Sequence, residues 1–300
     1  MSRYLDPKAD ITFKRVFGDP NHKERCISLL NALLPLAEGR EVVDIEYQSP
    51  EILPIILPMR NSIADVRCRD NLGRQFLVEM QMEWTVDFTS RILFNASKAF
   101  VSQFDIGSQF RDAKPVYSLN FINGIYLHEP EFADTYYHHY AIFDKENRAN
   151  KIEGIEFVLV ELPKFKAGTN DKNPFRDLWL RFLTEIEEKT DAVPKDLAAD
   201  KTIQSAIVCL ERGGYSKEEM FAYDYYWDQV RYAWALTEGK FLDGRAEGKA
   251  EGLAEGKAEG LAEGKAEANR ENARKMLEAG IPVETIKQIT GISFDSQPGT

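Results

Sequence analysis

The sequence predicts a mixed α/β protein of the α+β kind, with a helical extension and a low-complexity helical tail. Three observations lead to this prediction. Helical and strand-like hydrophobic patterns alternate over residues 1–165, only helical spacing is kept over residues 166–240, and a four-residue repeat follows. With 300 residues and 43% hydrophobic side chains, the chain is long enough to bury a core in one large domain or two small ones.

The first 165 residues contain the elements of the predicted sheet. Apolar residues at helical spacing predict helix over 9–35, with an interruption near Gly18, Asp19 and Pro20. Strands are predicted at 42–47, 62–68, 75–81, 116–122 and 155–162, and a long helix at 88–110. This order of helix, strands, long helix and further strands is typical of a mixed α/β domain.

Residues 174–238 are predicted to be helical. Pro174 suits the first turn of a helix. The aromatic residues between Met220 and Leu236 are expected to pack in a helical subdomain, and stacking on nucleic-acid bases is the less favoured interpretation. We therefore divide the chain into a core (1–165), a helical extension (166–240), a repeat linker (241–272) and a short helical end (273–300).

The linker contains a repeated unit, Glu-Gly-Lys/Leu-Ala, over residues 244–268. A four-residue step advances about 400° around a helix, so each unit drifts by about 40° and the glycines form no fixed seam. Glycine lowers helix stability by up to about 1 kcal/mol relative to alanine, and glutamates at i,i+4 repel one another. The repeat is therefore predicted to be a marginal helix that acts as a spacer or as a weak self-association segment.

Charge and composition exclude several classes of protein. The chain has 38 Lys and Arg against 49 Asp and Glu, a net charge of −11, so it lacks the overall basic character of many nucleic-acid-binding domains. Residues 1–115 are nevertheless close to neutral, with 15 basic and 16 acidic side chains. The sequence shows no apolar run of about 20 residues, no secretory signal and no cysteine framework, which predicts a cytoplasmic protein that makes no membrane contact.

The most informative pattern lies in residues 62–81. Two strand-like runs flank a turn-rich stretch, and a loop centred on Leu72 places residues whose numbers sum to 144 opposite each other. Asp65 then faces Glu79, with Cβ atoms about 4.5–5.5 Å apart. Strand alternation puts Gln81 on the same face as Glu79, whereas a slip of one residue would send both to the other face.

Two facing carboxylates suit a divalent cation. They repel each other, and Mg²⁺ prefers one or two carboxylates together with water and phosphate oxygens. Asp65 and Glu79 are therefore candidate ligands for Mg²⁺, with Mn²⁺ as an alternative ion, and Gln81 is a candidate for orienting a metal-bound water. The competing interpretation is a solvated strand face, or an ion pair of Glu79 with Arg67 or Arg74.

Together, these motifs resemble the PD-(D/E)XK nuclease core, and more specifically the bacterial recombination-promoting nucleases, also described as PD-(D/E)XK nuclease family transposases. The matching segments run in order over residues 4–240: Asp10-Ile-Thr-Phe-Lys14-Arg-Val-Phe17-Gly, Leu29-Leu-Asn-Ala-Leu-Leu, Asp65-Val-Arg-Cys, Phe76-Leu-Val-Glu-Met-Gln81, Arg91, Pro115-Val-Tyr and Val160-Glu-Leu-Pro-Lys-Phe165. The resemblance implies a restriction-endonuclease-like core and Mg²⁺-dependent endonucleolytic hydrolysis of DNA in recombination or transposition.

The resemblance also implies roles for individual residues. Asp65 and Glu79 would hold the metal, and Asp10 and Lys14 would add charged groups from the first helix, with helix capping as the alternative for Asp10. The wider family has lysine where this chain has Gln81. Glutamine only orients water by hydrogen bonds, although members of the resembled subgroup also carry it.

Three further basic residues, Arg67, Arg91 and Lys98, are candidate phosphate contacts, with surface ion pairs as the alternative. A homodimer is expected because cutting both strands of DNA needs two sites, and the repeat at 244–268 is a candidate for holding it together. The alternative function is a catalytically weak or inactive nuclease-fold module for DNA binding or assembly, which is consistent with Gln81 in place of lysine.

Overall fold

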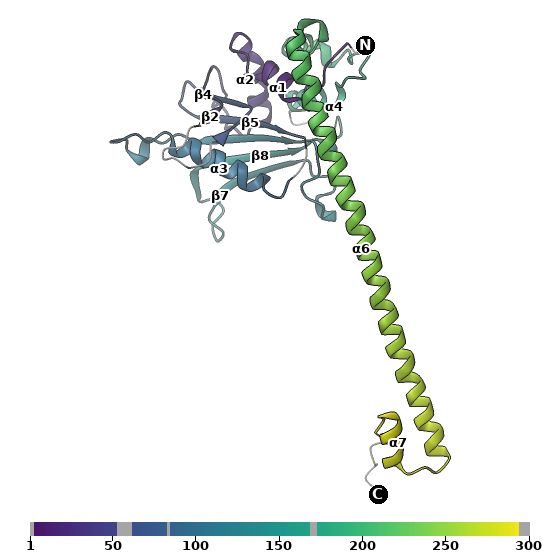
Figure 1. The fold of residues 1–300 in the computed structure, drawn as a ribbon. Coiled ribbons are helices and arrows are strands. Elements are labelled where there is room, and N and C mark those ends of the chain that lie inside the picture. Colours follow the sequence, from purple (N-terminus) through teal and green to yellow (C-terminus); the bar gives the residue numbers. More distant parts are fainter. Residues whose placement is uncertain (1–2, 53–61, 83–84, 169–172, 294–300) are drawn as a thin grey trace. The chain divides into compact units, whose positions relative to one another are not determined.

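A six-stranded mixed sheet forms the centre of residues 1–230 in the computed structural model, which describes residues 3–52, 62–82, 85–168 and 173–293 (Figure 1). Its strand order is β1-β4-β5-β6-β8-β7, and a separate two-stranded ladder joins β2 to β3. The strands are β1 (Ile45–Tyr47), β2 (Glu51–Ile52), β3 (Ser62–Ile63), β4 (Val66–Asp70), β5 (Gln75–Gln81), β6 (Val116–Ile122), β7 (Tyr137–Phe143) and β8 (Lys151–Glu161).

The middle of the sheet is parallel. β5, β6 and β8 run in the same direction, whereas β1 and β4 on one side and β7 on the other are antiparallel to their neighbours. The helix α3 (Phe88–Val101) connects β5 to β6 in the crossover that parallel neighbours require. The carboxyl ends of β5, β6 and β8 therefore lie at the same end of the sheet.

Helices cover both faces of the sheet. On one face, a large apolar core joins the sheet to α1 (Asp10–Phe17), α2 (Lys23–Leu33), α4 (Pro174–Glu185) and α5 (Lys201–Cys209). Phe17, Trp179 and Phe182 pack ring against ring in this core, with centroids 5.3 to 6.3 Å apart. On the other face, Ala96 and Ala99 of α3 pack on Leu77 and Val116, because small side chains let the helix approach the strands closely.

The amino-terminal segment is fixed by residues from the far end of the same unit. Tyr4 forms a bridge with Glu211, and the Leu5 N–H donates to the Leu210 carbonyl at 2.9 Å. The Asp6 N–H donates to the hydroxyl of Tyr223, in α6 (Lys217–Glu278), at 3.0 Å. These bonds place α1 beside the helices that end the unit.

Most of the predicted elements agree with the structure. The predicted strands at 75–81 and 116–122 coincide with β5 and β6, and the helix predicted over 9–35 forms as α1 and α2 with a break at 18–22. The predicted strand 62–68 is interrupted, because Ala64 and Asp65 separate β3 from β4. The helix predicted over 88–110 ends at Val101, where the Ser102 N–H bonds the Lys98 carbonyl. The strand β7 was not predicted.

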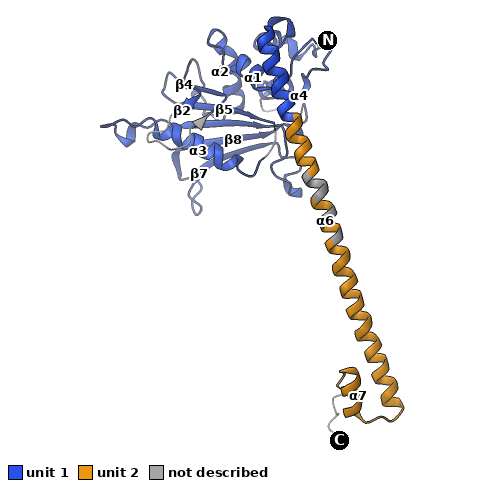
Figure 2. Ribbon diagram, in the orientation of Figure 1, with its two compact units in different colours: residues 1–230 blue, residues 231–300 orange. Residues whose placement is uncertain are grey.

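Residues 231–300 form a second unit (Figure 2). The repeat 244–268 lies within α6, so it is helical throughout, as predicted. In this unit α6 ends before Gly280, whose φ of +76° suits glycine, and α7 (Val283–Thr290) follows. Ala273 and Ile286 are fully buried, so the chain end is a small helical hairpin.

No helix in the described part of the chain is both long enough and apolar enough to cross a membrane.

Candidate active site

The β4–β5 hairpin has the predicted register. Val66 pairs with Val78 and Arg69 pairs with Gln75, so the numbers of partner residues sum to 144. Asp65 directly precedes β4, and the same register brings it to Glu79. The register follows from a tight turn in which Gly73 adopts a φ of +81° and the Asp70 carboxylate accepts the N–H groups of residues 72 and 74.

The backbone of the neighbouring strand fixes the Asp65 carboxylate. Asp65 Oδ2 accepts a hydrogen bond of 2.7 Å from the Met80 N–H, and Lys14 Nζ lies 3.9 Å from Asp65 Oδ1. The side chain of Asp65 is 22% exposed, so one oxygen is held by the backbone while the carboxylate still reaches solvent. This is the accessibility that a ligand site requires.

Glu79 is more deeply buried and is held from the other side. Only 6% of the residue is exposed, and Glu79 Oε1 accepts a hydrogen bond of 2.7 Å from the Asn95 side chain of α3. Asn95 is itself buried. The α3 helix therefore fixes the orientation of the second carboxylate, while the hairpin fixes the first.

Both carboxyl groups bind protons more tightly than usual. The pKa of Asp65 is raised from 3.8 to about 6, mainly by burial and also by the nearby Asp10 carboxylate, while the Met80 N–H and Lys14 act to lower it. The pKa of Glu79 is raised from 4.5 to about 7, mainly by burial and also by repulsion from Asp65, while the Asn95 hydrogen bond and Arg91 act to lower it. Two buried carboxylates that repel each other form a site suited to a cation.

Asp10 and Lys14 complete this cluster from α1. Lys14 Nζ lies 2.6 Å from Asp10 Oδ1, so Lys14 bridges Asp10 and Asp65. The capping alternative for Asp10 is wrong: Ala9 is the N-cap residue, no side chain caps this helix, and Asp10 is the first helical residue. Its carboxylate is thereby left to face Lys14 and the site.

Gln81 lies at the end of β5 and is engaged by α3. The Arg91 guanidinium donates a hydrogen bond to Gln81 Oε1, and Arg91 also lies 5.2 Å from the centroid of the Phe88 ring. The amide oxygen of Gln81 is therefore turned towards Arg91. Arg91 thus lies at the site, as its prediction as a phosphate contact requires.

The other two predicted phosphate contacts lie elsewhere. Arg67 donates to Gln75 at 3.0 Å, four residues before Glu79, which is about 13 Å along a strand. Lys98 donates to the Ile52 carbonyl at 2.9 Å, about two helical turns after Arg91. The structure therefore places Arg91 beside the carboxylates, and Arg67 and Lys98 farther from them. The alternative ion pair of Glu79 with Arg67 or Arg74 is not among the contacts found for the described residues, since Arg74 pairs with Asp70.

Two residues at the site are not identified by the sequence patterns. Asn95 lies one turn after Arg91 on α3, and this i,i+4 spacing is the signal that could have identified it. Tyr226 of α6 is close enough to Asp10 and Asp65 for their charges to raise the pKa of its phenol, although burial is the larger cause. No local pattern links residue 226 to the hairpin, because it reaches the site through the fold of the whole unit.

The donor set fits a hard divalent cation with few protein ligands. Among the residues that the structure describes, no group of three or more His, Cys, Asp or Glu side chains is placed to hold a metal. Asp65 and Glu79 supply carboxylate oxygens, and Mg²⁺ commonly takes one or two of these and keeps several waters. The pair therefore fits Mg²⁺ better than a metal that needs a full cage of protein ligands.

Comparisons with known proteins identify one family. A family model described as PD-(D/E)XK nuclease family transposase matches residues 7–233, which include every candidate site residue named above. No curated protein and no solved structure matches the chain.

Proposed function

Because the chain belongs to the PD-(D/E)XK nuclease family transposases, a family of nuclease- and transposase-related proteins, we propose that it is a Mg²⁺-dependent DNA endonuclease of recombination or transposition. The observation that carries this proposal is the pair of buried carboxylates, Asp65 and Glu79, held by a backbone N–H and by Asn95. The raised pKa of each carboxyl group reflects an electrostatic demand for a cation at this point.

A bound Mg²⁺ supplies charge stabilisation for the scissile phosphate and lowers the pKa of a bound water. Asp65 and Glu79 are the residues that would hold it, each in an orientation fixed by its own hydrogen bond. Lys14, 3.9 Å from Asp65, and Arg91, bonded to Gln81, are the cations placed to bind the oxygens of the DNA phosphate. DNA is therefore the proposed substrate.

Gln81 has a limited chemical role. Its amide neither accepts a proton from water nor carries a charge, so it orients a water by hydrogen bonding. The Arg91 hydrogen bond holds the amide oxygen of Gln81 towards Arg91. The absence of a proton-accepting or charged group on the Gln81 side chain favours the second candidate function, a nuclease-fold module that binds DNA and cuts it slowly or not at all.

The test is a cleavage assay on supercoiled plasmid DNA with Mg²⁺ or Mn²⁺. The wild-type protein should nick or linearise the plasmid, and Asp65→Asn and Glu79→Gln should each reduce the rate by at least about 100-fold while folding normally. Glu146→Gln, at an exposed carboxylate in the loop between β7 and β8, is the matched control. Undiminished cutting by both site variants would refute the site, and DNA binding without cutting by the wild type would support the second candidate.

A further inference from the structure

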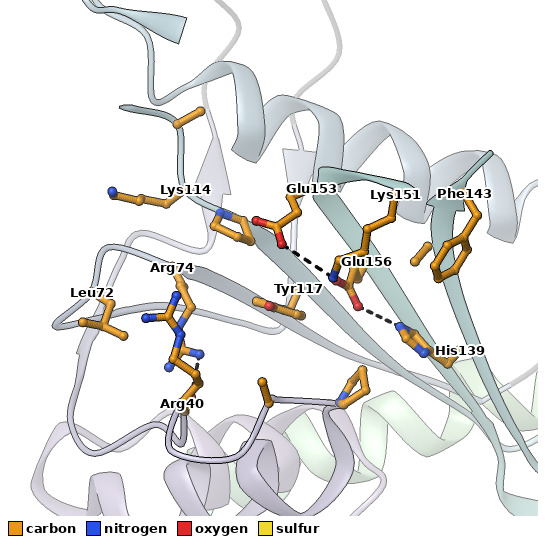
Figure 3. A pocket seen from close by; sticks show the side chains of 15 residues that line it. Arg40, Leu72, Arg74, Lys114, Tyr117, His139, Phe143, Lys151, Glu153 and Glu156 are labelled. Atoms are coloured by element: carbon orange, nitrogen blue, oxygen red, sulfur yellow. Dashed lines mark hydrogen bonds and ion pairs between the residues drawn. The ribbon is translucent and has the colours of Figure 1, made fainter. Parts of the chain in front are cut away.

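Figure 3 shows a cavity of about 520 Å³ that is lined by residues at the amino ends of β6 and β8. Its floor includes Tyr117, which pairs with Phe76 across β5 and β6. Glu79 is three residues after Phe76, so it lies on the other face of the sheet and nearer the carboxyl end of β5. The cavity is therefore separate from the candidate active site.

Cationic side chains outnumber carboxylates around this cavity. Its lining contains two arginines and two lysines against two glutamates, in a chain whose overall net charge is −11: Arg40, Arg74, Lys114, Lys151, Glu153 and Glu156. Asp70, which is outside the lining, neutralises Arg74 through an ion pair of 2.7 Å. An excess of positive charge remains after this pairing, which favours an anionic ligand.

The charges are separated across the cavity. Figure 3 shows Arg40 and Arg74 on one side and the line of Glu153, Lys151, Glu156 and His139 on the other, with Tyr117 between them. Lys151 Nζ lies 3.7 Å from a carboxylate oxygen of each glutamate. Within the described part of the chain, no ion pair is found for Arg40. The same holds for Lys114, but the planar Arg40 guanidinium offers the fork of donors that pairs with two phosphate oxygens at once, so Arg40 is the proposed anion contact.

The floor of the cavity offers an aromatic surface. Tyr117 stacks on Phe76 with ring centroids 5.6 Å apart and an interplanar angle of 14°, so its ring is held in a fixed orientation. Tyr117 is partly buried, and Phe143 at the rim is 48% exposed. Flat, rigid aromatic surfaces of this kind bind planar heterocycles by stacking and edge contacts.

The glutamate side provides hydrogen-bond acceptors. Glu156 Oε2 lies 2.7 Å from His139 Nε2, and the hydrogen bond with His139 is the main cause that lowers the pKa of Glu156. Glu156 therefore stays ionised at neutral pH, and Glu153 beside it is largely solvent-exposed. Carboxylates in these positions accept hydrogen bonds from the amino groups of a heterocycle.

We propose that this cavity binds a nucleotide, with its base against Tyr117, the amino edge of the base towards Glu153 and Glu156, and the phosphate at Arg40. The volume lies within the range of about 300–1,000 Å³ that is common for small-molecule sites. A free mononucleotide and the terminal nucleotide of a DNA strand present the same chemistry. This site is independent of the metal-dependent reaction proposed above.

The test is calorimetric titration of the full chain with dAMP in the presence of EDTA, so that no metal contributes. One dAMP should bind per chain, and deoxyadenosine and ribose 5-phosphate should each bind at least tenfold more weakly. Arg40→Glu should weaken dAMP binding at least tenfold because it replaces attraction by repulsion. Arg270→Glu, at an exposed arginine of the second unit, is the matched control and should change the affinity less than twofold.

A second variant, Tyr117→Leu, tests the stacking surface, with thermal unfolding recorded to confirm that it is folded. Absence of saturable dAMP binding at 10 mM, or equal binding by the Arg40→Glu and Arg270→Glu variants, would overturn the proposal. Competition by a 5′-phosphorylated oligonucleotide at the concentration effective for dAMP would identify a DNA end as the source, and competition by mononucleotides alone would identify a free nucleotide. Both results support a nucleotide site.

Discussion

The wild-type protein should lose folding stability as the pH rises, and replacing both site carboxylates by their amides should abolish this loss. The double variant Asp65→Asn/Glu79→Gln keeps the size of each side chain and keeps oxygens that accept from the Met80 N–H and from Asn95. It removes only the negative charges. Other charged groups that face the pair are Asp10 and Lys14 on α1 and Arg91 on α3, and these stay in place.

The magnitude follows from the pKa of each group. A rise in pKa from 3.8 to about 6 for Asp65, at about 1.4 kcal/mol per unit, corresponds to about 3 kcal/mol, and the rise from 4.5 to about 7 for Glu79 to about the same. Because the charge of Asp65 contributes to the shift of Glu79, the two values do not add fully. Together they lower the free energy of unfolding by about 3–6 kcal/mol once both groups are ionised.

The sign follows from proton linkage. In both cases the folded protein holds the proton more tightly than the unfolded chain, so the unfolded chain loses its protons first as the pH rises. The stability contributed by the protonated groups is therefore complete below about pH 4. It is lost as the pH rises to about pH 7. Above this pH both groups are ionised, and the free energy of unfolding is lowered by the full amount.

The assay is urea denaturation in EDTA at several values between pH 4 and pH 8. The wild type should lose about 3–6 kcal/mol more than the double variant over this range, and 10 mM Mg²⁺ at pH 8 should restore part of the loss for the wild type only. Parallel pH profiles for the two proteins would refute the reasoning, because they would show that neither carboxyl group titrates abnormally.

Three further predictions concern other parts of the structure. Asn95→Leu removes the hydrogen bond that orients Glu79, and calorimetry should show Mg²⁺ affinity falling by about 10–100-fold while the fold is kept. Arg74→Met should lower the free energy of unfolding by about 3–5 kcal/mol because it leaves the Asp70 carboxylate buried and unpaired, whereas Arg69→Met, which breaks an exposed pair with Glu46, should cost less than about 1 kcal/mol. Deleting residues 244–300 should convert a dimer to a monomer in analytical ultracentrifugation if the repeat holds two chains together.

Each of these predictions has a contradicting outcome. Unchanged Mg²⁺ affinity in the Asn95→Leu variant would show that Glu79 needs no support from α3. Equal losses for Arg74→Met and Arg69→Met in urea denaturation would show that burial does not govern these ion pairs. An identical mass for the full and shortened chains would remove the repeat as a self-association segment.

The hairpin could be predicted from the sequence because its register is set locally. Asp70 and Gly73 form the turn, and the alternation of apolar residues in β5 fixes which side chains share a face. The family match supports the same core, whereas the catalytic roles of Asp65 and Glu79 stay predictions. Local patterns were sufficient where the relevant residues lie within about 20 positions of one another.

Features that depend on distant parts of the chain could not be predicted in this way. β7 lies at the edge of the sheet and contains His138 and His139, so its pattern lacks the apolar alternation of a half-buried strand. His138 is buried against β8, where its Nε2 lies 2.8 Å from Glu161 Oε1. Tyr226 likewise comes near enough to Asp65 to be affected by its charge only through the tertiary fold, which no local spacing describes.

The bonds between the amino-terminal segment and residues 210–223 have a consequence for biosynthesis. Leu5 and Asp6 find their partners only after Leu210 and Tyr223 have left the ribosome. At about 5–20 residues per second, the roughly 200 residues between these groups take about 10–40 s to translate. The helix that carries Asp10 and Lys14 therefore reaches its final position only after residues 210–223 have been synthesised. The charged cluster should form late, after the hairpin that holds Asp65 and Glu79.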